Sequence, residues 1–550
     1  MPLDTLITGR IATLAGPSGF GWVEAIGIRD GRIAFAGSEI DLETRADPHT
    51  SRITLEHDVV AIPGLTDAHL HLAQAARALR QVDLSDASSL EAGMAAVHAA
   101  HQRLSGDPEA WIDGHGWDAD RWGRWPTAAD LERVAPGRRV VLWAHDHHAM
   151  LASHAALRCG DVSAATDDPP GGIIRRGADG SPEGVLYEAA TRLVTVHQPP
   201  PDVAVLEAAI ETVGRELVSL GVVACHDPGA LAPDPDLTFS FPAYAALAER
   251  DDLPVRVHAS LRDDALGTAI ERGLRSGAVL GDDPDGWARI GWQKLFADGS
   301  MGSRTAALLA DIEPEADQPL PADRRRGVWT TDPEQLAELA RRAASAGIST
   351  QIHAIGDAAV RTALDVLAAT DPAVPLMPRL EHVQLLDPAD RGRFAAHGIA
   401  ASVQPCHVGS DAAKARRLWG ARAEASGYAW ATIARTGAVL AFGTDAPVEP
   451  VDPWPGIALA VRREDPRWPA GTPPFGPQEA LTLDRALRAQ CVDPAVAARE
   501  TDRGRLVPGQ RADVVVITAA AIDDPVEAGG PLSSARPSMV LMDGEVVFER

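Results

Sequence analysis

The chain has 550 residues, more than one compact hydrophobic core usually organises, so we expect a large domain with at least one smaller module. Its 77 acidic and 51 basic side chains give a net charge of -26, which argues against a nucleic acid or an anionic membrane as a partner, because both require a positive surface. The N-terminus lacks a basic segment followed by an apolar core, and no run of about 18 apolar residues occurs, so we expect a cytoplasmic, unanchored protein.

Both ends of the chain alternate short β-type segments with turns. Residues 1–58 include Asp30-Gly31, a strong hairpin signal, and residues 505–550 carry a similar turn at Asp543-Gly544. Two β segments that bracket a long α/β middle are most simply explained as one small β-sandwich built from residues 1–58 and 505–550.

The middle of the chain, residues 59–504, alternates strands with amphipathic helices, as a parallel sheet built from βα units does. Eight segments are strand candidates: 59–63, 222–225, 255–257, 290–294, 348–352, 379–381, 399–403 and 439–442. They predict an α/β fold with a (β/α)8 barrel, whose active site lies at the carboxyl ends of the strands. Residues 73–205 break the alternation, and we expect them to form an insertion over the mouth of the barrel, after its first strand.

A His-x-His pair, His69 and His71, follows the first of these strands. Residues i and i+2 of a strand point to the same side, so both imidazoles can reach one metal ion. The pair alone is a weak signal, but the ends of later strands add four candidate ligands: Lys294, His353, His382 and Asp445. Imidazoles and a carboxylate suit Zn²⁺ or a similar divalent ion, which lowers the pKa of bound water from about 15.7 towards about 7 and so supplies a nucleophile.

Two of these ligands have more specific predicted roles. A neutral Lys294 amine can take up CO₂ to form a carbamate whose oxygens bridge two ions; the alternative is a lysine that pairs with Asp298 or extends to solvent. Asp445 can ligate the metal, accept the proton of the attacking water and return it to the leaving group, whereas the alternative is a helix-cap or turn aspartate.

Other side chains are weaker candidates, for contacts with a substrate: Trp117, Asp146, His148, His226 and His407. For His226 and His407, as for His258, a hydrogen bond at the barrel mouth is an equally good interpretation. The tryptophans of the insertion either shape an apolar pocket or simply pack against the barrel.

These motifs resemble the amidohydrolase superfamily, and more closely its branch of YtcJ-like and N-substituted formamide deformylase-like proteins, the amidohydrolase 3 type. The most specific segments are residues 63–71, 294–304, 353–357, 381–384, 404–411 and 443–448. The resemblance implies that His69 and His71 bind a first metal and that His353 and His382 serve a second. It also implies that a carboxylated Lys294 bridges the two ions and that Asp445 is the catalytic acid/base.

We therefore expect a metal-dependent amidohydrolase that cleaves a non-peptide C–N bond in a small amide, N-acyl or N-formyl compound, with one or two divalent ions, most simply Zn²⁺. An ester, lactone or phosphoester hydrolase at the same site and a non-catalytic scaffold on this barrel are the alternatives. Residues 146–149 and 153–154 of the insertion differ from the motifs of the family that the chain resembles. These differences do not affect the predicted metal ligands, but they leave the identity of the substrate open. The oligomeric state is also open, with a homodimer as a candidate.

Overall fold

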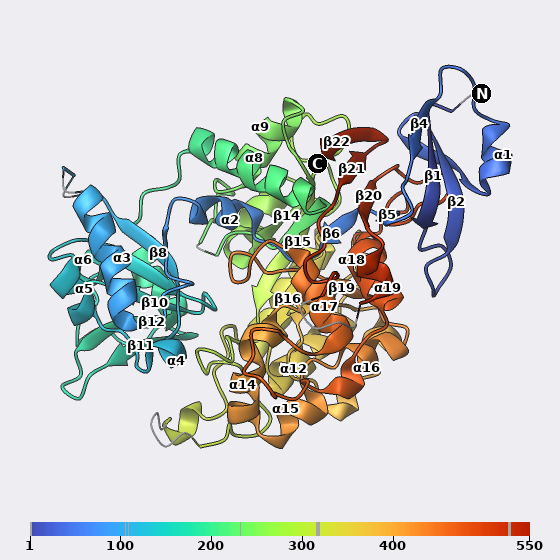
Figure 1. Ribbon diagram of the computed structural model, residues 1–550. Helices are drawn as coiled ribbons and strands as arrows, with labels where there is room; N and C mark the ends of the chain where they lie inside the picture. Colours follow the sequence, from blue (N-terminus) through green and yellow to red (C-terminus); the bar gives the residue numbers. More distant parts are fainter. Residues whose placement is uncertain (1–2, 105, 108, 232, 315–319, 526–529) are drawn as a thin grey trace.

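Three β-sheets organise the protein (Figure 1). The computed structural model describes residues 3–104, 106–107, 109–231, 233–314, 320–525 and 530–550. One sheet combines strands from both ends of the chain, a second lies within the predicted insertion, and a third holds eight parallel strands. None of the helices in the described ranges is long and apolar enough to cross a lipid bilayer.

The parallel sheet forms the barrel. Its strands follow one another in sequence order: β6 (Leu65–Asp67), β13 (Val222–Asp227), β14 (Arg256–Arg262), β15 (Ala288–Phe296), β16 (Thr350–Ala354), β17 (Arg379–His382), β18 (Ala400–Val403) and β19 (Leu440–Phe442). Each pairs in parallel with its neighbours. Just beyond β6, the Ala68 N–H donates to the Phe442 carbonyl at 2.8 Å, which brings the first and last strands together. The predicted α/β fold with a (β/α)8 barrel is confirmed.

Helices cover the outside of the barrel (Figure 1). Their apolar residues recur at helical spacing, as in α11, where Leu336, Leu339, Ala340 and Ala343 are buried on one face and the Asp332 side chain caps the first turn. The barrel helices are α2 (Leu72–Ala78), α8 (Val203–Ser219), α9 (Phe241–Glu249), α10 (Leu266–Glu271), α11 (Pro333–Ser345), α12 (Asp357–Ala368), α13 (Arg393–His397), α14 (His407–Trp419), α15 (Ala421–Ser426), α16 (Trp430–Arg435), α17 (Pro453–Arg462) and α18 (Leu483–Ala497).

The terminal sheet corrects one strand assignment. Its members are β1 (Thr5–Ala12), β2 (Trp22–Arg29), β3 (Arg32–Gly37), β4 (Ser51–Thr54), β5 (Val59–Pro63), β20 (Val514–Thr518), β21 (Met539–Met542) and β22 (Glu545–Glu549), with the short helices α1 (Glu39–Glu43) and α19 (Ala520–Asp523) nearby. Residues 59–63, predicted as the first barrel strand, pair with β20 instead, and the barrel begins after Gly64 at β6. Apolar periodicity cannot separate two consecutive buried strands from one.

The insertion has a sheet and hydrophobic clusters of its own. Its strands are β7 (Val82–Asp83), β8 (Ile112–Trp117), β9 (Val140–Ala144), β10 (Ala149–Ala152), β11 (Gly172–Arg176) and β12 (Pro182–Glu188), and its helices are α3 (Leu90–Arg103), α4 (Ala119–Trp122), α5 (Ala128–Val134), α6 (His154–Cys159) and α7 (Arg192–Thr195). Helix α2, inside the predicted insertion range, packs against α8 on the barrel. The sheet of the insertion therefore spans a narrower range, residues 82–188, than the predicted 73–205.

Candidate active site

His69 and His71 lie in the loop after β6, at the carboxyl end of the barrel. This differs from the expectation of a strand that carries both imidazoles. The strand ends at Asp67 because the chain bends at Ala68 to reach the end of β19, and His71 precedes the first residue of α2. The side chain of Leu70, between the two histidines, is buried in the core. The loop, rather than strand periodicity, brings the two rings together, with centroids 5.4 Å apart.

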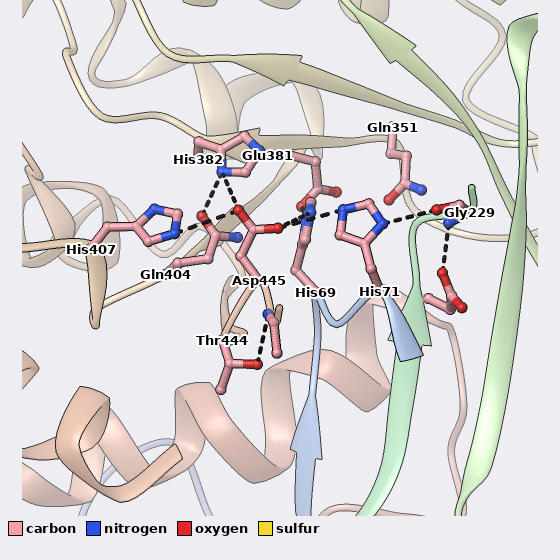
Figure 2. A network of polar contacts seen from close by, with 12 residues as sticks. His69, His71, Gly229, Gln351, Glu381, His382, Gln404, His407, Thr444 and Asp445 are labelled. Carbon is pink, nitrogen blue, oxygen red and sulfur yellow. Dashed lines mark hydrogen bonds and ion pairs between the residues drawn. The ribbon is translucent and has the colours of Figure 1, made fainter. Parts of the chain in front are cut away.

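Asp445 lies at the centre of the histidine cluster (Figure 2). Its Oδ1 is 3.3 Å from His69 Nε2 and 3.5 Å from His71 Nε2, while its Oδ2 is 3.9 Å from His382 Nδ1 and 3.5 Å from His407 Nε2. Ligand atoms of His69, His382 and Asp445 all lie within 4.8 Å of one another. An ion with ligand bonds of about 2.0–2.2 Å fits such a group after small side-chain adjustments.

The tautomers of the imidazoles support the same interpretation. Polar atoms hold one ring nitrogen of each of three histidines: His69 Nδ1 is 2.5 Å from Glu381 Oε2, His71 Nδ1 is 2.8 Å from the Gly229 carbonyl, and His382 Nδ1 is 2.8 Å from Gln404 Oε1. Such partners orient metal-binding imidazoles and fix their protonation. Among the described residues, the buried His69 Nε2 has no partner that meets hydrogen-bond geometry, as expected of an atom that ligates an ion. The donor set therefore fits a divalent metal.

Glu381 is kept ionised by a buried arginine. Burial alone would raise the pKa of Glu381, but Arg379 and His69 outweigh it and lower the pKa to about 2. Arg379 Nε lies 2.6 Å from Glu381 Oε1, and its guanidinium stacks over Trp292 at 4.0 Å and donates to Gln351. No role was predicted from the sequence for Arg379, Glu381 or Gln404. Only Glu381 and Gln404, which lie in the segments that carry the family resemblance, gave any signal.

Lys294, on β15, is 1% exposed, and burial is the main cause that lowers its pKa to about 8. The alternative pairing with Asp298 is not seen. The Asp298 oxygens instead accept backbone N–H groups of three residues, Ala307, Ile355 and Gly356. Across the described ranges, no carboxylate lies within 4.0 Å of Lys294 Nζ, which is 5.0 Å from the centroid of the Phe296 ring. The amine is thus buried and without a compensating ion pair.

His353 completes the group of predicted ligands. Its ring centroid lies 4.4 Å from that of His382, and its Nε2 is 3.1 Å from the Gly299 carbonyl. His382 and Asp445 have positive φ values, 73° and 63°, which non-glycine residues rarely adopt. Strained backbone of this kind clusters at functional sites, where the surrounding structure holds it in place.

The cluster forms the base of a cavity of about 200 Å³ between the barrel and the insertion. Five of the six predicted ligands line it; the sixth, His69, is not part of the lining but lies 3.3 Å from Asp445 Oδ1. Four of the five predicted substrate contacts also line the cavity: Trp117, Asp146, His148 and His407.

His226 is the exception. It is fully buried in the barrel interior, outside the cavity lining, where its Nδ1 accepts a hydrogen bond from Arg379 at 3.0 Å and its ring lies 5.1 Å from Trp292. This position does not support a substrate contact at His226. His258, a similar candidate, is its neighbour at 5.2 Å. The sequence assigned both histidines to barrel strands, but it could not predict how deep in the barrel interior their side chains lie.

Two residues of the insertion, Asp146 and His148, contact the barrel. Asp146 accepts hydrogen bonds from Ser300 Oγ at 2.6 Å and Ser303 Oγ at 2.7 Å, in the loop after β15. The ring centroid of His148 lies 4.8 Å from that of His353, on β16. His148 Nδ1 is 2.8 Å from Glu188, on β12 of the insertion; burial would lower the pKa of His148, but Glu188 outweighs it and raises the pKa to about 9. The insertion thereby forms one wall of the cavity.

Comparison with known proteins identifies the family. The family model for the amidohydrolase family, Amidohydro_3, matches residues 57–548. The chain belongs to the amidohydrolase family. This amidohydrolase is 30% identical over 532 residues to YtcJ of Bacillus subtilis (strain 168), an amidohydrolase by name, with 96% of each chain covered. It is 26% identical to the N-substituted formamide deformylase of Arthrobacter pascens, with 96% of this chain and 95% of the relative covered.

The solved structure of a metal-dependent hydrolase from Pyrococcus horikoshii OT3 has the same fold, with a TM-score of 0.71 and 24% identity over 96% of the amidohydrolase and 99% of the archaeal chain. The predicted family is therefore confirmed, and with it the predicted enzyme class, a metal-dependent amidohydrolase.

Proposed function

We propose that this amidohydrolase hydrolyses a non-peptide C–N bond of a small amide, N-acyl or N-formyl compound with the help of one or two divalent ions, Zn²⁺ first among them. The observation that carries the proposal is the convergence of His69, His382 and Asp445 at the base of the cavity, where His69 Nε2 makes no hydrogen bond within the described part of the chain and lies 3.3 Å from Asp445 Oδ1. The relative named N-substituted formamide deformylase supports the N-formyl class. A cavity of about 200 Å³ suits a small molecule.

His69, His71 and Asp445 would hold a first ion, and His353 and His382 a second, with a carboxylated Lys294 between them. A bound divalent ion would supply Lewis acidity that polarises the substrate carbonyl and makes coordinated water acidic near neutral pH. The lowered pKa of Lys294, about 8, supports the carbamate, because it increases the fraction of neutral amine, which is the form that reacts with CO₂. No carboxylate within the described ranges forms an ion pair that would hold the amine in its charged form.

Asp445 is the proton carrier of the proposal. Burial would raise its pKa, but the imidazoles around it outweigh burial and hold the pKa well below its ordinary value, so Asp445 is ionised and its oxygens carry no proton before the reaction. Oδ2 accepts the proton of the attacking water and then delivers it to the leaving nitrogen, so that acid and base are the same group. His407 Nε2, 3.5 Å from Oδ2, is positioned to hold the carboxylate or a substrate oxygen.

A substrate screen tests which type of bond the enzyme hydrolyses. N-formyl, N-acyl, ester, lactone and phosphoester compounds are offered to enzyme reconstituted with Zn²⁺ or Mn²⁺, and turnover of the N-formyl or N-acyl set is expected. Preference for an ester, lactone or phosphoester would reassign the bond, and metal-loaded enzyme inert to the whole panel would favour the non-catalytic scaffold.

The Asp445→Asn variant tests the mechanism. We expect turnover to fall about 10²–10⁴-fold, the usual contribution of general acid–base catalysis, while metal remains bound to the histidines. Metal content by mass spectrometry accompanies the assay. Near-normal turnover in metal-loaded Asp445→Asn would reject the role.

A further inference from the structure

A second cavity, of about 430 Å³, lies at the opposite end of the barrel from the catalytic cluster. It is bordered by the first residues of β14 and β15 and by the segment after α18. None of the predicted metal ligands lines it, and of the candidates for a substrate contact only His258 does. The proposed hydrolysis gives it no role.

Arginines dominate the lining of this amino-terminal cavity. Five contribute, in a chain whose net charge is strongly negative: Arg256, Arg289, Arg499, Arg503 and Arg511. Glu500 and Asp502 are the acidic residues of the lining. Arg256 and Arg511 are neutralised by ion pairs to aspartates, since Arg256 contacts Asp513 and Asp543 and Arg511 contacts Asp502 and Asp543. The other three arginines of the lining are Arg289, Arg499 and Arg503.

Arg289 and Arg499 have no acidic partner within 4.0 Å in the part of the chain that the structure describes. The hydrogen bonds of their side chains go to backbone carbonyls: Arg289 Nη1 donates to Gly277 at 3.0 Å, and Arg499 Nη2 donates to Pro372 at 3.2 Å. Carbonyl oxygens satisfy N–H groups but carry no full negative charge to pair with a guanidinium. The cavity therefore carries surplus positive charge.

Arg503 supplies an independent indication of a ligand. The residue is 4% exposed, and its Nε donates to Glu500 at 2.9 Å, with Nη2 bound to the same carboxylate. Its Nη1 is buried and, among the described residues, has no hydrogen-bond partner. A buried guanidinium N–H without an acceptor is costly, and such groups in native proteins usually bond to an acceptor, which a bound anion can supply.

We propose that this cavity binds a small multiply charged oxyanion of the phosphate class, with Arg289, Arg499 and the free Nη1 of Arg503 as its donors. Guanidinium groups are planar, permanently charged and matched in geometry to tetrahedral oxyanions, and an anion here would compensate the surplus charge and satisfy the buried N–H together. The site does not depend on the proposed hydrolysis, because it lies at the other end of the barrel.

Calorimetric titration of the full chain with inorganic phosphate, at constant ionic strength set with chloride, tests the site. The wild type should bind phosphate, and Arg289→Gln and Arg499→Gln should each weaken binding about tenfold, the effect of losing one charge-assisted hydrogen bond. Within the described ranges, both side chains bond only to backbone carbonyls, and both reach solvent, so the variants are expected to fold, which circular dichroism checks.

Two controls establish whether phosphate binds in this cavity or elsewhere on the protein. Arg341→Gln, at an exposed arginine on α11, should keep wild-type phosphate affinity, which excludes a general charge effect. Asp445→Asn should keep it too, because phosphate held in the catalytic cavity would respond to that change. Absence of binding up to millimolar phosphate, equal binding by wild type, Arg289→Gln and Arg499→Gln, or a changed phosphate affinity in Asp445→Asn would each overturn the proposal.

Discussion

Glu381 Oε2 lies 2.5 Å from His69 Nδ1, and both side chains are fully buried. A carboxylate in this position requires the proton of the imidazole on Nδ1, which leaves Nε2 as a lone-pair donor toward Asp445 and the cavity. Because Arg379 keeps Glu381 ionised, the protonation of His69, a proposed metal ligand, depends on an arginine that does not line the cavity.

Glu381→Gln tests this relationship. The amide can accept the same hydrogen bond but carries no charge, so the preference for the Nδ1–H tautomer weakens and Arg379 loses its ion pair. We expect metal affinity to fall about 10–100-fold, the usual effect of a change in such an orienting group. Competition with a metal-sensitive dye measures the affinity.

Glu479→Gln is the matched control, since Glu479 is also buried but accepts hydrogen bonds from Thr432, away from the cavity. It should lower stability without changing metal affinity. Equal metal affinity in Glu381→Gln and wild type would show that the carboxylate does not orient His69.

Lys294→Ala should sharply reduce the metal content of the purified protein, since the proposed bridge disappears. The chain contains only two lysines, Lys294 and Lys414, so one variant at each position assigns a lysine carbamate. After incubation with isotopically labelled bicarbonate, carbon NMR should detect a carbamate signal in wild type and in Lys414→Arg but not in Lys294→Ala. Unchanged metal stoichiometry in Lys294→Ala would rule out the bridge.

Gly443→Ala should disturb the first ligand pair. A Cβ at position 443 would lie 2.4 Å from the backbone N of His69 and 2.7 Å from its Cβ, so the loop that carries His69 must move. We expect a loss of about 1–3 kcal/mol in the free energy of unfolding, as for other overpacked sites, together with weaker metal binding. Denaturant titration and metal content measure the two effects. Gly392→Ala, where a Cβ meets nothing within 4 Å, should change neither.

Asp130 links stability of the insertion to pH. Burial would raise its pKa, but Arg124 and the N–H and hydroxyl of Thr127 outweigh it and lower the pKa from 3.8 to about 2. Since the folded pKa is depressed, the carboxylate stabilises the fold above pH 3.8, and this contribution is lost as the pH falls towards 2. Asp130→Asn should therefore cost about 1 kcal/mol at neutral pH, a typical value for a helix cap, and progressively less in acid. A pH-independent difference in denaturant titrations would contradict this.

The sequence predicted much of the barrel because βα alternation is a local signal. Seven of the strand candidates overlap barrel strands, and the fold class followed from their number. The assignment of residues 59–63 failed because β5 and β6 are both apolar and only Gly64 separates them. Which sheet a buried strand joins depends on its partner, here β20, and no local pattern carries that information.

The candidate site, like the fold, could be predicted from the sequence only in part. Residues at strand ends, such as Asp445 and His382, could be proposed because the ends of parallel strands meet at one rim. The partners that orient them could not be assigned. Gly229 contributes a backbone carbonyl, which has no side-chain signature, and Glu381 acts across the barrel on His69. The spacing of residues in the sequence likewise could not predict that His226 is fully buried in the barrel interior.

The pairing of β5 with β20 has a consequence for how the enzyme matures. Ribosomes deliver His69 and His71 early, whereas the strand that anchors the segment before them lies near the other end of the sequence. The barrel strands that carry the remaining imidazoles and Asp445 also emerge later. A nascent polypeptide thus holds an incomplete ligand set on an unanchored segment, and acquisition of the ion is expected to follow translation rather than to guide it.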